Sequence, residues 1–107
     1  MISENLALLK ELDLETWKDI IFPIKNCLVD APRTPLEQGI YEALVQAGVQ
    51  RVIEKMGRQW QITSWNPVGE LRYLASISNT SGLIVWDDTE GDSPADALLA
   101  AYIEAIQ

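Results

Sequence analysis

The chain has 107 residues, 48% of them hydrophobic, and carries 16 acidic against 8 basic side chains for a net charge of −8, with no histidine and one cysteine. This length predicts one globular domain over residues 1–107, and the acidic balance disfavours binding to nucleic acid or to membranes while favouring a protein partner with a basic surface. Without histidine the chain lacks the usual proton shuttle and any Ser-His or Cys-His nucleophile pair, and one cysteine excludes an intramolecular disulfide and a structural zinc site.

Two helices are expected at the start of the chain. Ser3 is a candidate N-cap for a first helix of about three turns, in which leucines recur at helical spacing. Asp13 can cap a second helix that continues to Leu28. Pro23 lies inside it and predicts a kink or a break, because proline removes a backbone hydrogen bond. Cys27 falls beside apolar positions, so we expect it to be a buried small hydrophobe.

The firmest local signal belongs to a third helix. Thr34 at the N-cap, Pro35 at the first helical position and Glu37 two residues later predict a capping box. Gly48 stands where a glycine would end this helix. The apolar stripe that the helix would bury consists of Leu36, Ile40, Ala43, Leu44 and Ala47.

The segment 49–56 is compatible with a strand or a helix. Its apolar pattern changes phase after Gly48, which argues against one continuous helix. A glycine at position 57 would also suit a tight turn into the following strand. We favour a strand in which Ile53 pairs with Ile62, with a helix as the alternative. This choice decides whether the sheet has four strands or three.

Residues 58–88 predict an antiparallel sheet that the flanking helices cover. The runs RQWQITSW, LRYLASIS and LIVWDD are separated by the turn clusters NPVGE and NTSG. Alternation of apolar and polar residues is cleanest in the second run, as in a strand with one buried face. Three of the four tryptophans lie here and are expected to pack in the core. Trp65 is the one we expect to be exposed, because it is out of phase with Trp60 and Ile62.

A last helix is predicted from Ser93, Pro94 and Asp96, which repeat the capping pattern. One of its faces is apolar and the other is mostly alanine, which would let the sheet or a second copy of the chain approach closely. The fold expected is therefore α+β, with a helical N-terminal half, a three- or four-stranded antiparallel meander, and a C-terminal helix packed on the sheet. The predicted core is Leu9, Trp17, Ile21, Ile40, Leu44, Trp60, Ile62, Tyr73, Ile77, Val85, Leu98, Leu99 and Tyr102.

An acidic segment spans residues 87–92. It fails the EF-hand calcium pattern, since a serine and a leucine stand where that loop needs its glycine and its bidentate glutamate. Asp87, Asp88 and Glu90 are left without a structural role at what is expected to be an exposed corner. We expect these three carboxylates, together with Trp65, to belong to a surface that binds a partner.

The sequence contains no phosphate-binding glycine motif and no nucleophile-elbow motif. We therefore expect no catalytic residues, no metal site, no cofactor and no enzymatic activity. The function expected is that of a small acidic binding protein, such as an inhibitor, an immunity protein, a chaperone or an adaptor. One alternative is a self-associating structural module, a homodimer through the C-terminal helix. The other is a protein that binds a small ligand or cation with the tryptophan-rich sheet and the segment 87–92.

No motif identifies a family, and small proteins of this layout are common in bacteria and phages. The first residues show no secretory signal, and no apolar run is long enough to cross a membrane. A cytoplasmic location is the expectation.

Overall fold

The computed structural model describes residues 2–26, 32–66, 69–78 and 89–107. Over these residues the chain forms four helices and three strands. Their order is α1 (Ile2–Leu12), α2 (Leu14–Asn26), α3 (Pro35–Lys55), β1 (Trp60–Trp65), β2 (Arg72–Ile77), β3 (Thr89–Gly91) and α4 (Pro94–Ile106). The expected α+β arrangement is confirmed: helices come first, an antiparallel sheet follows, and a C-terminal helix packs on it.

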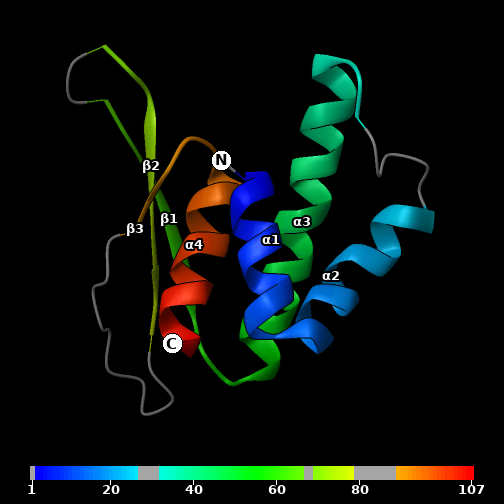
Figure 1. Ribbon diagram of the computed structural model, residues 1–107. Helices are drawn as coiled ribbons and strands as arrows, with labels where there is room; N and C mark the ends of the chain where they lie inside the picture. The colour runs from blue at the N-terminus through cyan, green and yellow to red at the C-terminus, as the bar shows by residue number, and fades with distance from the viewer. Residues whose placement is uncertain (1, 27–31, 67–68, 79–88) are drawn as a thin grey trace.

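The sheet forms one layer and the helices form the rest of the molecule (Figure 1). Helix α4 is the central element, because it contacts all three strands as well as α1 and α3. Helix α2 packs against α1 and α3. The most deeply buried side chains come from all four helices: Leu9, Ile20, Ile24, Val45, Val49, Ile53, Leu98 and Leu99. Each such side chain stabilises the fold by about 1.5–3 kcal/mol relative to an exposed position. Among the described residues, no helix combines the length and the apolar character that crossing a membrane requires.

Helix α3 is longer than expected. It continues through residues 49–55, so the strand that we favoured there is wrong, and so is the pairing of Ile53 with Ile62. Gly48 does not end the helix because it is buried against α2. A Cβ atom at Gly48 would lie 3.2 Å from two side-chain carbons of Ile20. The missing side chain serves close packing of the two helices, and the glycine that ends α3 is Gly57, with φ of 73°.

The buried face of α3 is also rotated from the expected one. Val45, Val49 and Ile53 face the core at a spacing of four, together with Gly48. Leu36 is instead 75% exposed and Ile40 43% exposed, so the expected burial of Ile40 is wrong. The close contact at Gly48 fixes which side of α3 faces α2. With that side buried, the apolar residues of the first two turns of α3 face away from the core.

The described sheet has the order β1-β2-β3 with both pairs antiparallel. Trp60 lies opposite Ile77 and Ile62 opposite Ala75, which brings apolar residues together on the face toward α4. The strand expected at 83–88 lies outside the described residues. Residues 89–91, which we expected to be loop, form the third strand.

Local signals predict the starts of α3 and α4. The capping box is present: the Glu37 amide donates to Thr34 Oγ1 over 3.1 Å, and the Thr34 amide donates to Glu37 Oε2 over 3.1 Å. Ser93 Oγ accepts from the Asp96 amide over 3.1 Å. Both N-caps are confirmed. Ser3 lies inside α1 and is not an N-cap, and α2 continues through Pro23 without a break.

The rest of the predicted core is mostly confirmed. The buried members are Leu9, Ile21, Ile77, Leu98, Leu99 and Tyr102. The members that pack against this core while partly buried are Trp17, Leu44, Trp60, Ile62 and Tyr73. Val85 and Cys27 lie outside the described residues.

Candidate functional site

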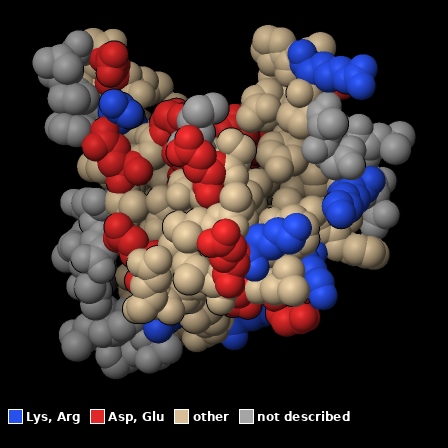
Figure 2. Space-filling model, viewed as in Figure 1, with Lys and Arg blue, Asp and Glu red and all other residues tan. Residues whose placement is uncertain are grey.

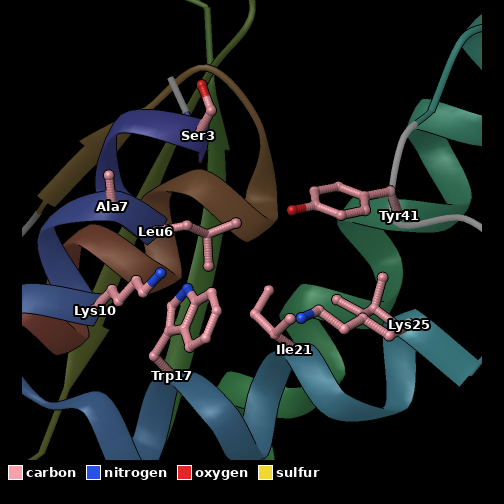
Figure 3. Close-up of a pocket in the computed structure, with 9 residues that line it drawn as sticks. Ser3, Leu6, Ala7, Lys10, Trp17, Ile21, Lys25 and Tyr41 are labelled. Atoms are coloured by element: carbon pink, nitrogen blue, oxygen red, sulfur yellow. The ribbon is translucent and has the colours of Figure 1, made fainter.

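A groove of about 340 Å³ lies between α1, α2 and α3 (Figure 3). This volume is at the lower end of the range for pockets that hold small ligands. Helices α1 and α2 supply most of the wall, and α3 supplies Tyr41. The lining residues are Ser3, Leu6, Ala7 and Lys10 from α1, Trp17, Ile21, Ile24 and Lys25 from α2, and Tyr41 from α3.

The spacing of these residues follows from helical geometry. On α1 they recur at intervals of three, four and seven, and on α2 at intervals of four, seven and eight. Such intervals place side chains on one face of a helix. Each helix therefore turns a single stripe toward the groove, apolar in its middle and ending in a lysine.

The junction at Asp13 determines how the two stripes meet. Asp13 alone separates α1 from α2. Its carboxylate accepts hydrogen bonds from the Thr16 amide over 3.2 Å and from the Thr16 hydroxyl over 2.7 Å, which caps α2 as expected. The Asp13 amide donates to the Leu9 carbonyl over 2.7 Å and so closes the last turn of α1. This reversal brings Trp17 back beneath Lys10, as Figure 3 shows.

Two ammonium groups converge on one indole ring. Lys10 Nζ lies 4.6 Å from the centroid of the Trp17 ring, and Lys25 Nζ lies 5.8 Å from it. Both distances are in the range of cation–π attraction. Among the described residues, no carboxylate lies within ion-pair distance of either ammonium. The groove is therefore a positively charged place on a chain whose net charge is −8.

The groove has an apolar floor and a polar edge. Leu6, Ile21 and Ile24 are buried beneath it. Tyr41 points its hydroxyl toward the cavity from α3, and Ser3 stands at the upper edge in Figure 3. A second pocket of about 150 Å³ shares Trp17, Ile21 and Lys25 with the groove and is bordered by Phe22. This arrangement suits binding of a group that is apolar at one end and anionic at the other.

Of the four side chains expected from the sequence to bind a partner, the structure describes only that of Glu90. Asp87, Asp88 and the side chain of Trp65 lie outside what it describes. Glu90 is exposed on β3, and its Oε1 atom lies 3.2 Å from Arg72 Nε on the neighbouring strand. Glu90 therefore has a structural role, as one half of a cross-strand ion pair.

Asp96 has the role that its place at a helix start predicts. Its carboxylate is buried and accepts from Asn5 Nδ2 over 2.8 Å and from the Asp92 amide over 3.3 Å, which connects α1 to the start of α4. Burial, together with the nearby Asp96 carboxylate, raises the pKa of Asp92 above its ordinary value of 3.8. In the part of the chain that the structure describes, no three potential metal ligands cluster.

The sequence analysis did not identify Lys10 and Lys25 as site residues, and it assigned Trp17 to the core. A signal was present for Lys25 alone, which lies eight residues after Trp17 and so on the same face of α2, whereas Lys10 lies on the other helix. The comparison with protein-family models, curated proteins and solved structures finds no match to this chain.

Proposed function

We propose that this protein is a non-enzymatic binding protein that acts through contacts with another protein. The observation that carries this proposal is the apolar stripe at the start of α3. Leu36 and Ile40 lie one turn apart, 75% and 43% exposed, on the part of α3 that projects beyond α1 and α2 (Figure 1). Single exposed apolar residues are ordinary, but a helical stripe of them is the kind of surface that a partner covers.

Charge supports a partner with a basic surface. Acidic side chains outnumber basic ones two to one in the sequence. On the face shown in Figure 2, acidic side chains lie mostly toward the sheet and α4, and basic ones mostly toward α2 and α3. A basic partner would be attracted over a distance by the acidic part of the surface and then held by apolar contacts. We include Asp87, Asp88, Glu90 and Trp65 in the proposed partner-binding surface.

Self-association through α4 has less support. Ala97 and Ala101, on its alanine-rich side, are buried within the chain by the sheet and the other helices. Ala100 is half-buried and Ala105 is exposed, so only the second half of that side is left for a second copy. Binding of a cation by the segment 87–92 also has less support, because the acidic residues there do not follow the spacing of a calcium loop.

The experiment is affinity capture from the native host, followed by binding measurements with the captured partner. Leu36→Ser with Ile40→Ser should abolish capture or weaken it at least tenfold, since two anchors of the contact are lost. Leu12→Ser with Leu71→Ser removes two exposed leucines elsewhere and serves as the matched control, with binding retained. Equal binding by both double variants would refute the role of α3.

The acidic surface is tested by charge. Changing Asp87, Asp88 and Glu90 to Asn, Asn and Gln should slow association several-fold at low salt and flatten its salt dependence. The control neutralises the exposed carboxylates of Glu11, Glu15 and Asp19, which changes the net charge equally at another place. Equal on-rates and equal salt slopes for the two triple variants would show that the total charge matters and the position does not.

A further inference from the structure

We propose that the groove between α1, α2 and α3 binds a small organic anion, a carboxylate attached to an apolar body. This site is separate from the protein-binding surface proposed above, and it is not the place where the sequence suggested a small ligand. Lys10, Lys25 and Trp17 would hold the anionic end, and the buried floor would hold the apolar body.

The charge arrangement is the first support. The chain carries twice as many acidic as basic side chains, so a lysine on its surface has many carboxylates to pair with. Lys10 and Lys25 nevertheless converge on the Trp17 ring, at 4.6 and 5.8 Å, with no carboxylate of a described residue in ion-pair range. Figure 3 shows the Trp17 ring between the two ammonium groups, so each of them borders the groove from its own side of the indole. A ligand carboxylate beside either ammonium would supply an ion-pair partner of the kind that the described residues do not provide.

The walls favour an anion that carries an apolar group. Leu6, Ile21 and Ile24 form a buried apolar floor, and the half-buried Trp17 indole borders the space with one face. A bare anion such as acetate would leave the exposed part of this indole face in contact with water. An apolar body would cover this indole face, and the removal of apolar surface from water contributes to affinity.

The size of the groove limits the ligand. A volume of about 340 Å³ corresponds to roughly ten water molecules. It suits a compact molecule with a single ring or a short chain. Ser3 places its hydroxyl group at the side of the groove away from its floor, where it can donate to or accept from a polar substituent, and the Tyr41 ring borders the same side.

The test uses three probes of one shape: 3-phenylpropanoate, 3-phenylpropan-1-ol and 3-phenylpropylamine, which are anionic, neutral and cationic. Each is titrated into the ¹⁵N-labelled protein, and the indole N–H signal of Trp17, identified by its loss in Trp17→Phe, reports binding. The acid should shift this signal saturably with a Kd of roughly 0.1–5 mM, the range for so small a ligand. The alcohol and the amine should bind at least fivefold more weakly, and acetate should give no saturable shift.

Paired variants test the lysines. Lys10→Gln with Lys25→Gln should weaken binding of the acid about tenfold, because both charges are lost while glutamine keeps the helices. Arg51→Gln with Lys55→Gln removes the same charge from exposed positions on α3 and should bind like the wild type. The proposal is overturned if the alcohol binds as well as the acid, if the lysine variant binds like its control, or if Trp17 shows no saturable shift at 10 mM acid. None of these outcomes depends on a protein partner, so failure here leaves the proposed function untouched.

Discussion

Gly91 offers the sharpest test of how α4 sits on the sheet. A Cβ atom at Gly91 would lie 2.6 Å from Ala97 Cα and 2.9 Å from the Asp96 carbonyl carbon, both in the backbone of the first turns of α4. Ordinary contacts between carbon atoms are about 3.5–4.0 Å. Gly91→Ala therefore requires β3 and α4 to separate by about 1 Å, and the atoms in the way belong to a helix backbone that cannot rotate aside.

The cost follows from the position of α4. This helix contacts every strand and two other helices, so a shift at its start disturbs the whole core. Overpacking costs 1–3 kcal/mol in general, and we expect about 3 kcal/mol here because no flexible side chain absorbs the added methyl group. For a domain of about this length, that loss lowers the melting temperature by roughly 10–20 °C.

Two other glycines give the matched series. Gly39 lies in α3 with nothing within 4 Å of its added Cβ, so Gly39→Ala should stabilise the protein by about 1 kcal/mol through helix propensity alone. A Cβ atom at Gly48 would lie 3.2 Å from Ile20, so in Gly48→Ala the gain in helix propensity is opposed by an overpacking cost of about 1–3 kcal/mol. The stability of this variant should therefore lie between those of the other two.

The assay is equilibrium urea denaturation followed by circular dichroism, in which a shift of the midpoint at constant slope measures stability. The order expected is Gly39→Ala above wild type, then Gly48→Ala, then Gly91→Ala. A Gly91→Ala protein within about 0.5 kcal/mol of wild type, the scatter of ordinary surface substitutions, would show that β3 does not lie against α4 as described.

Three further predictions concern caps and carboxylates. Thr34→Ala and Ser93→Ala should each lower the free energy of unfolding by about 1 kcal/mol in urea denaturation, and no change in either would mean that the helix starts elsewhere. The pKa of Asp92 is raised in the folded state by burial and by the Asp96 carboxylate, so its contribution to stability is lost as the pH rises from its ordinary pKa of 3.8 through the raised value. Asp92→Asn should therefore raise the melting temperature slightly near neutral pH but not below pH 3.8, and the same gain at both pH values would contradict this reading. Calcium should barely change the melting temperature, because the spacing of acidic residues in 87–92 does not match a calcium loop, and a rise of many degrees in sub-millimolar calcium would indicate a cation site there.

The starts of helices were predictable because capping is local. The box at Thr34 and Glu37 and the cap at Ser93 involve residues only three apart, so their geometry is contained in a short stretch of sequence. The antiparallel sheet was predictable for a related reason, since alternation along LRYLASIS identifies a half-buried strand without reference to its neighbours.

The course of α3 was not predictable in the same way. Gly48 is a valid stop signal when the local sequence alone is considered. What overrides it is a contact with Ile20, 28 residues earlier in the chain, that only the folded structure contains. The groove could not be predicted from local sequence for the same reason. Lys10 contacts Trp17 only because the Asp13 junction sets the angle between α1 and α2.

The surface proposed for protein binding is a consequence of that single contact. A helix that ended before Gly48 would have 13 residues, the length of α2, and would be about 20 Å long, so its neighbours could cover it. The helix that continues has 21 residues and is about 31 Å long, whereas α1, with 11 residues, is about 16 Å long. At least two turns of α3 must then extend past the helices beside it. The buried contact at Gly48 fixes which end extends, and it is the end that carries Leu36 and Ile40. The exposure of Leu36 and Ile40 therefore follows from the way the core is packed. Local spacing predicted that both would be buried, and the packing that overrides this prediction also makes them the strongest candidates for contact with a partner.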